Sequence, residues 1–308
     1  MINKPVIYPI GGGKGGIGKS FITANLGSLL ATEGKKVVLV DLDLGGANLH
    51  TFLGRDAIEN GIGSFLDKTA KTLGEVAATT DRDNLFFISS SDCTSEIANL
   101  YAAQKSKLIR AIRKLDYDYV FLDLGGGIHF NTIDFFLSSN QGIFVLTAEP
   151  TAIENAFNFI KAVYFRIVKK TLKQNKFIKL RQHLNLNVNA ADQSFRLIRE
   201  VNRLDPEKGV LLQQMMGRFH FHFIVNQLKK NTDPSIGNKI ETVCNQHFYS
   251  RFNFLGTIRY DEKIHDSLFS KKTFIDKYTY TLSAQDLKSI AKQLSWEKEA
   301  DIYKVQRA

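Results

Sequence analysis

A glycine-rich stretch near the N-terminus, residues 11–20, contains residue types that can bind phosphate. Its sequence, GGGKGGIGKS, has the spacing G-x-x-x-x-G-K-[ST] from Gly13 to Ser20. Backbone N–H groups of such a loop turn toward phosphate oxygens, and the N-terminus of the next helix adds partial positive charge. Lys19 would reach the β- and γ-phosphates of a nucleotide, and Ser20 would bind Mg²⁺. A simple turn is the alternative, but the helical pattern of residues 21–30 favours the phosphate site.

Carboxylates end two apolar runs further along the chain. Asp41 and Asp43 end the run that starts at residue 36, and Asp123 ends the run at residues 119–124. Ligands of open α/β sheets bind beyond the carboxyl ends of the strands, and the period of two puts Asp41 and Asp43 on one face. Carboxylates beside a phosphate loop would be costly without a cation, and Mg²⁺ supplies that charge. Solvated aspartates, or a simple turn after Asp123, are the alternatives.

These motifs resemble those of the ParA/MinD family of ATPases with a deviant phosphate loop. The similarity consists of K-G-G-x-G-K-S at residues 14–20, D-x-D at residues 41–43 with the downstream Asn48, the strand ending in Asp123, and Glu149-Pro150. It covers about residues 5 to 165 and 219 to 295, and is strongest toward the flagellar-number and cell-division branches. The resemblance implies an ATP-dependent homodimer in which Lys14 reaches the nucleotide of the partner.

The resemblance also implies roles for single residues. Catalysis would depend on Lys14, Lys19 and Asp43, with Asp43 orienting the attacking water. Mg²⁺ would be held by Ser20, Asp41 and Asp123. Nucleotide contacts would come from the following residues: Gly13, Lys14, Gly15, Gly16, Ile17, Gly18, Lys19, Ser20, Phe21, Asn226, Arg259 and Asp261.

One residue of this pattern fits the family, and two segments depart from it. Asn226 fits an adenine-reading position, because its amide offers both a donor and an acceptor. The I-P-x-D segment, however, reads Ile258-Arg259-Tyr260-Asp261, so arginine replaces proline. Arg259 would either stack on the base or face solvent. Three consecutive glycines, residues 125–127, replace the usual pattern of the second switch.

Composition limits the class of protein. The chain has 308 residues, 44% of them apolar, which allows a substantial core. Cys93 and Cys244 are far apart, so we expect neither a disulfide framework nor a metal cluster. No run of 18 apolar residues exists. A reducing cytoplasm is the simplest setting, with peripheral binding to membrane or nucleoid left open.

The order of apolar runs predicts an α/β fold. Strand-like runs alternate with helical patterns, notably at residues 95–115 and 152–172, as in a doubly wound, mostly parallel sheet flanked by helices. We expect about seven strands in one P-loop ATPase domain spanning residues 1–308. The predicted strands are residues 6–10, 36–42, 85–89, 119–124, 142–147, 219–226 and 252–258.

A basic helical insertion, residues 161–218, interrupts the pattern between two strands. It has 13 Lys and Arg against 4 Asp and Glu, so it holds most of the net charge of +10. Residues 161–181 include eight basic residues and no acid, with an apolar stripe on the other side of the helix. A solvated face, an anionic surface of lipid or DNA, and a protein partner are the three interpretations. Two more helices are expected in residues 190–216, broken near Pro206. The C-terminal residues 294–304 have no sustained apolar face, so no membrane anchor is expected there.

The sequence thus predicts a cytoplasmic, Mg²⁺-dependent ATPase that dimerises with ATP and positions flagella, a division site or DNA. A nucleotide-gated binding or scaffold module with little turnover is the alternative. Carriers of metal clusters share the loop but need bridging cysteines, which Cys93 and Cys244 do not supply.

Overall fold

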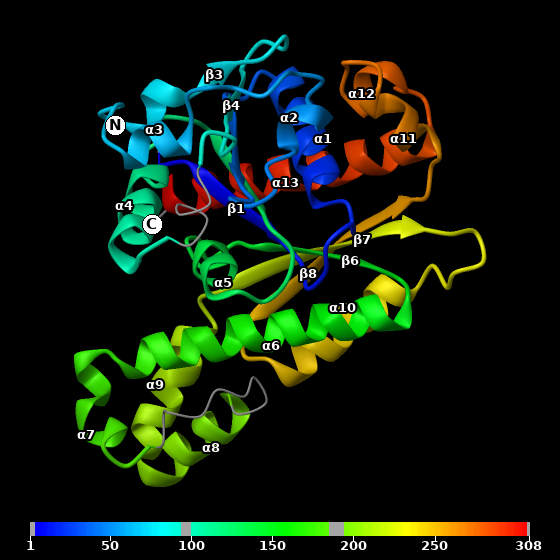
Figure 1. Ribbon diagram of the computed structural model, residues 1–308. Helices are drawn as coiled ribbons and strands as arrows, with labels where there is room; N and C mark the ends of the chain where they lie inside the picture. The colour runs from blue at the N-terminus through cyan, green and yellow to red at the C-terminus, as the bar shows by residue number, and fades with distance from the viewer. Residues whose placement is uncertain (1–3, 94–99, 185–193, 307–308) are drawn as a thin grey trace.

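The centre of the molecule is an eight-stranded sheet covered by helices on both faces (Figure 1). The computed structural model describes residues 4–93, 100–184 and 194–306. The strand order is β3-β4-β2-β5-β1-β6-β7-β8, and every neighbouring pair is parallel except β3 and β4. In chain order the strands are Val6–Gly11 (β1), Val37–Leu42 (β2), Ala78–Thr79 (β3), Leu85–Ile88 (β4), Tyr119–Leu124 (β5), Ile143–Thr147 (β6), His220–Leu228 (β7) and Arg251–Arg259 (β8).

This sheet confirms the predicted doubly wound, mostly parallel α/β fold. All seven predicted strands are present, since near-continuous apolar runs are typical of strands buried on both faces. All six residues of β2 and all six of β5 are buried. The eighth strand, β3, was missed because two residues are too short to produce an alternating pattern.

Each face of the sheet has its own hydrophobic core. One face packs against α1 (Lys19–Thr32), α2 (Leu49–Phe52), α12 (Phe274–Lys277) and α13 (Leu282–Gln306). The other packs against α3 (Ile62–Leu66), α4 (Ala102–Ile112), α5 (Phe130–Phe136), α6 (Pro150–Leu172) and α10 (Ile236–His247). The short helices η1 (Leu73–Val76) and α11 (Lys263–Leu268) lie beside α3 and α12. The helix predicted over residues 95–115 is α4, and residues 94–99 lie outside the described part.

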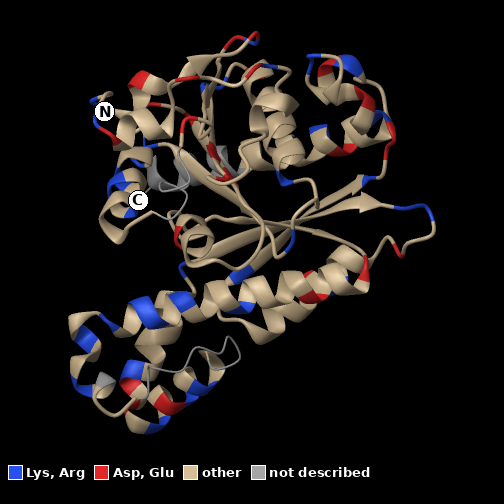
Figure 2. Ribbon diagram, viewed as in Figure 1, with Lys and Arg blue, Asp and Glu red and all other residues tan. Residues whose placement is uncertain are grey.

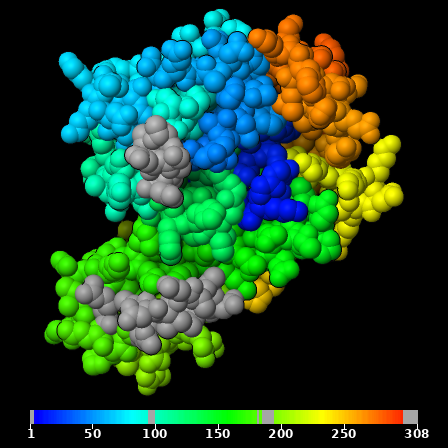
Figure 3. Space-filling model, in the orientation of Figure 1, coloured from blue at the N-terminus to red at the C-terminus, as the bar shows by residue number. Residues whose placement is uncertain are grey.

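The helical insertion extends from the body as a separate lobe (Figures 1 and 3). It continues α6 into η3 (Asn175–Phe177), α7 (Ile178–Arg181), α8 (Ser194–Leu204) and α9 (Pro206–Met216). The break predicted near Pro206 is found, because Asp205 caps α9 by accepting a hydrogen bond from Lys208 N at 3.0 Å. Among the described residues, no helix is long and apolar enough to cross a membrane.

Candidate active site

The glycine-rich loop connects β1 to α1 at the carboxyl end of the sheet. Gly18 has φ +91°, and a Cβ there would lie 2.2 Å from Asn226 Nδ2, so only glycine fits this position. Lys14 is exposed at the tip of the loop, whereas Lys19 is only 8% exposed. Figure 3 shows the loop at the surface, in the darkest blue. In this loop, therefore, Lys14 is exposed and Lys19 is buried.

Lys19 lies close enough to two carboxylates for their charges to shift its pKa. Its Nζ donates a weak hydrogen bond to Lys14 O at 3.4 Å. Burial lowers the pKa of Lys19, while the charges of Asp123 and Asp43 raise it. The structure thus brings together the lysine and two of the three aspartates that the sequence selected.

Asp41 and Asp123 lie side by side on the paired strands β2 and β5. Both are almost fully buried, and burial raises the pKa of each carboxyl. The charge of Asp41 raises the pKa of Asp123 further, and the charge of Asp43 raises that of Asp41. Asp123 Oδ1 accepts a hydrogen bond from Thr23 Oγ1 at 3.4 Å, and its Oδ2 is buried without a hydrogen bond in the described structure. An unpaired buried carboxylate oxygen beside a second acid fits a hard divalent cation such as Mg²⁺.

Asp41 has an additional structural role. Its Oδ1 accepts a hydrogen bond from Asp43 N at 3.0 Å, and its Oδ2 accepts one from Leu49 N at 3.2 Å. The same segment is tied to the loop, because Ser20 Oγ donates to Asn48 Oδ1 at 3.0 Å. Asp41 therefore fixes the backbone of residues 43–49, which positions the Asp43 carboxylate.

The three glycines after β5 allow this carboxylate and the phosphate loop to approach closely. A Cβ on Gly126 would lie 2.9 Å from Gly15 N, and one on Gly125 would lie 2.9 Å from Asp43 Oδ1. A cleft of about 560 Å³ opens beside them, lined by Asp43, both glycines and the exposed His129 and Phe130. The departure from the family pattern at residues 125–127 thus has a steric reason in this chain.

Asn226, near the end of β7, supports the loop through a hydrogen bond to its backbone. Its Nδ2 donates to Ile17 O at 2.8 Å, and its Oδ1 is buried without a hydrogen bond in the described structure. Gln227 Nε2 donates to Gly16 O at 3.3 Å. Gln227 and Thr23 are site residues that sequence reasoning missed. The available signals were that Gln227 directly follows Asn226 and that Thr23 lies one helical turn after Lys19.

The side chains of three other predicted nucleotide contacts are engaged by other parts of the protein. Arg259 forms a bidentate pair with Asp286 on α13, with Nε–Oδ2 at 2.9 Å and Nη2–Oδ1 at 2.6 Å. Asp261 accepts a hydrogen bond from Ser283 Oγ at 3.2 Å, so both residues hold the end of β8 against α13. The Phe21 side chain is buried against Phe274, which leaves its backbone for any ligand contact.

Comparison with known proteins shows which family the sequence matches. A sequence model of the CobQ/CobB/MinD/ParA nucleotide binding domain matches residues 9–274. The septum site-determining protein MinD of Helicobacter pylori is 28% identical over 183 residues, covering 59% of this chain and 66% of that protein. The antiactivator FleN of Pseudomonas aeruginosa is 29% identical over 166 residues, covering 50% of this chain and 55% of FleN. The matches span less than two thirds of these relatives.

Solved structures share the fold. MinD of Pyrococcus horikoshii, in complex with Mg-ADP, has a TM-score of 0.60 and 19% identity, covering 94% of this chain and 95% of that one. A putative plasmid partition protein of Borrelia burgdorferi bound to AMPPNP has a TM-score of 0.61 and 18% identity, covering 96% of this chain and 100% of that one. At this identity the likeness establishes the fold alone.

Proposed function

This chain belongs to the CobQ/CobB/MinD/ParA family of nucleotide-binding domains, and from that membership we propose that it is an ATP-hydrolysing switch. It dimerises when it binds ATP, and it positions a cellular cargo. The observation that supports this proposal most is the convergence of Lys19, Asp43 and Asp123 at the phosphate loop. Relatives named for septum-site determination and plasmid partition support a positioning role.

Each residue near the loop has a distinct part in the proposed reaction. Loop N–H groups and Lys19 bind the phosphates, and Asn226 Oδ1 is the acceptor left for the amino group of adenine. Ser20 and Asp123 would hold Mg²⁺, with Asp41 beside them. Mg²⁺ supplies charge neutralisation when bound. Asp43, fixed by Asp41, orients the water that attacks the γ-phosphate.

Lys14 completes the site of the second copy in the proposed dimer. Its exposure at the loop tip leaves it available to a partner, where it would stabilise charge that develops on the phosphates. A nucleotide-gated module with little turnover is the second candidate. The glycines at residues 125–127 and the pairing of Arg259 with Asp286 motivate it, since both segments depart from the family pattern.

The test compares wild type with Lys14→Ala, using Lys230→Ala as the control at another exposed lysine. We expect Lys14→Ala to bind ADP normally, to remain monomeric with a non-hydrolysable ATP analogue in sedimentation, and to release phosphate about a hundredfold more slowly. Normal dimerisation and hydrolysis by this variant would show that the cross-dimer role is wrong. A stable wild-type dimer that releases no phosphate would favour the module without turnover.

The insertion is the proposed contact with a partner, either an anionic surface of lipid or DNA or an acidic protein. Two groups of its cations have different surroundings. Lys170 and Arg166 pair with the buried Asp134 on α5, with nitrogen–oxygen distances of 2.9 and 2.7 Å, so they serve the fold. Lys173 and the more distal Lys176 and Lys179 are exposed, and they are the candidates for binding (Figure 2). The protein would act in the cytoplasm, peripherally on membrane or nucleoid.

A further inference from the structure

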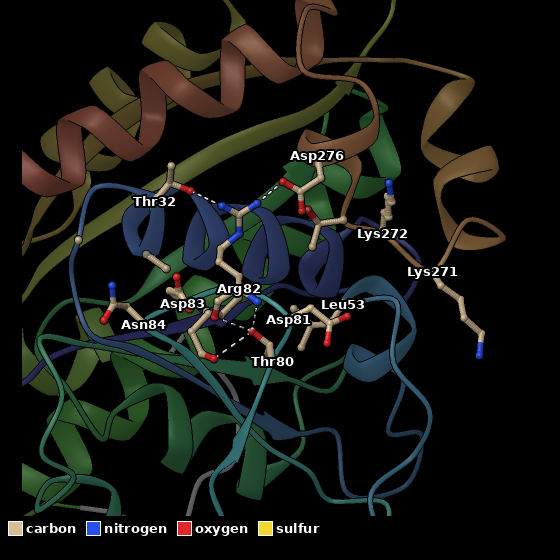
Figure 4. Close-up of a pocket in the computed structure, with 14 residues that line it drawn as sticks. Thr32, Leu53, Thr80, Asp81, Arg82, Asp83, Asn84, Lys271, Lys272 and Asp276 are labelled. Atoms are coloured by element: carbon tan, nitrogen blue, oxygen red, sulfur yellow. Dashed lines mark hydrogen bonds and ion pairs between the residues drawn. The ribbon is translucent and has the colours of Figure 1, made fainter.

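Two of the cavities that lie away from the phosphate loop differ in charge. The larger, of about 700 Å³, is crossed by Arg82, which binds Thr32 and Asp276 (Figure 4). Its lining carries three cations and three carboxylates, and among them Asp81 pairs with Arg55 and Lys271 pairs with Asp56. The charges around this cavity therefore nearly balance. The cavity lies between the β3–β4 turn and α12.

The second cavity, which we name the α4 pocket, has about 600 Å³ and lies between α4, η1 and the starts of β2 and β5. This place is at the amino ends of the strands, opposite the phosphate loop. Five cations line it against one carboxylate, Asp116, and Figure 2 shows basic residues along α4. The cations are Lys36, Lys71, Lys107, Arg110 and Lys114.

Two of these cations are held in place by the protein. Lys107 Nζ donates to Phe65 O at 2.7 Å and lies 4.2 Å from the centre of the Phe65 ring. Lys36 Nζ lies 4.9 Å from the centre of the Tyr117 ring and 3.4 Å from Asp116 Oδ2. The Asp116 side chain is 82% exposed, so water weakens that pair. Two ammonium groups of the pocket are thus already ordered.

The other three cations form the rim. Lys107 and Arg110 lie one helical turn apart on α4, and Lys114 follows two residues after the end of that helix. Lys71 lies on the η1 side of the pocket. In the described part of the chain, Lys71, Arg110 and Lys114 form no ion pair, and the nearby Glu75 accepts hydrogen bonds from Lys71 N and Thr72 Oγ1 instead. The rim charge is available to a ligand.

We propose that the α4 pocket binds a small phosphorylated compound with two or more negative charges. Its volume is in the range of ligand sites, and its buried floor of Phe65, Leu73 and Leu115 lowers the local dielectric and concentrates the field of the cations. Lysine ammonium groups act as compact charges that suit phosphate. One multivalent anion would replace several salt ions in this field. The site is independent of the proposed ATPase activity.

The test uses the full chain with its phosphate loop saturated by Mg-ADP. Calorimetry measures the binding of two probes, a hexose bisphosphate and inorganic pyrophosphate. The variants are Arg110→Glu with Lys114→Glu, and the milder Arg110→Gln with Lys114→Gln. The matched control is Lys173→Glu with Lys179→Glu, which reverses two exposed charges in the insertion.

We expect wild type and the control to bind at least one probe, more weakly at high salt, and both α4 pairs to lose at least about tenfold in affinity. No binding of either probe by wild type would overturn the proposal, as would an equal loss in the control. Phosphatidylserine vesicles form the second arm. Vesicle binding that depends on Arg110 and Lys114, without probe binding, would identify a lipid surface and overturn the small-ligand proposal. Phosphate release from ATP should be unchanged in both α4 pairs, which separates this test from that of the active site.

Discussion

At the scale of single residues, the shape of the loop depends on positions where only glycine fits. Gly18 is left-handed, and Asn226 fills the space that a Cβ would need while its amide holds Ile17 O. Gly126 allows the second switch to touch the loop backbone. Nucleotide affinity should therefore depend on glycines as much as on Lys19.

Gly18→Ala should weaken the binding of Mg-ADP by at least about tenfold, because the strained backbone and the clash with Asn226 cost on the order of 1–3 kcal/mol. Gly74→Ala is the control, since a Cβ there meets nothing within 4 Å. Calorimetric titration with Mg-ADP measures both. Equal affinity in the two variants would contradict the steric account.

His222 makes the stability of the fold sensitive to acid. It is fully buried in β7, and burial, followed by the charge of His220, lowers its pKa from 6.5 to about 3. The unfolded chain therefore takes up a proton as the pH falls below 6.5, and the folded chain does not until about pH 3. Across that window the free energy of unfolding should fall by about 1.4 kcal/mol per pH unit from this group.

His222→Phe should remove this contribution, because an aromatic ring fits beside Tyr8, whose ring centre is 5.9 Å away. Urea unfolding at about pH 7 and about pH 5 measures the change in stability for each protein. The exposed His247→Gln is the control and should keep the wild-type dependence. An unchanged pH dependence in His222→Phe would refute the assignment.

At the scale of elements, one buried carboxylate joins three helices. Asp134 on α5 binds Lys105 Nζ of α4 at 2.6 Å, Lys170 Nζ of α6 at 2.9 Å, and both Nε and Nη2 of Arg166. Burial alone would raise the pKa of Asp134, but hydrogen bonds from Arg166, Lys105 and Lys170 outweigh it and hold the pKa below its ordinary value. Because α5 follows the glycines at residues 125–127, this hub connects the second switch to the root of the insertion.

Asp134→Asn should lower the free energy of unfolding by about 3–5 kcal/mol, because it removes the counter-charge of the partly buried Lys105 and Arg166 as well as of the more exposed Lys170. Asp233→Asn, which breaks an exposed pair with Lys239, should change stability little. Chemical denaturation followed by circular dichroism measures both variants. A small effect of Asp134→Asn, similar to that of the control, would show that the hub is not needed for stability.

At the scale of the whole molecule, basic residues gather in two places outside the loop. The insertion presents Lys173, Lys176 and Lys179 on an extended lobe, whereas the α4 pocket is concave and lies on the body (Figure 2). An extended lobe suits a large partner, and a pocket suits a small ligand. The same net charge therefore supports two different proposals.

Reversing the charge of Lys173, Lys176 and Lys179 with glutamate should abolish binding to acidic vesicles or DNA at low salt, because exposed cations supply most of such attraction. Lys170 is left intact, since its loss would disturb Asp134. Arg110→Glu with Lys114→Glu is the control. Co-sedimentation measures vesicle binding, and a filter assay measures DNA binding. Undiminished binding in the triple variant, or none in wild type, would remove the insertion as an anion-binding surface.

Much of this protein could be predicted from local pattern. The seven longer strands, α6, and the pair α8 and α9 followed from apolar periodicity, because burial imposes a period of two, a period of 3.6, or a continuous run. The loop, Asp41, Asp43 and Asp123 were found because phosphate and Mg²⁺ chemistry requires fixed residue types at the ends of strands. The roles of these residues remain predictions.

Contacts between distant segments could not be predicted in this way. The fold class, the family and the position of the phosphate loop could be read from the amino-acid sequence, since these depend on spacing within short segments. Three features emerged only from the folded chain: Arg259 binds Asp286, Lys170 and Arg166 pair with Asp134, and α4 and η1 enclose a basic pocket. The physical reason is that a side chain's charge is set by the residue type, whereas the free or paired state of that charge depends on what folding brings within about 4 Å.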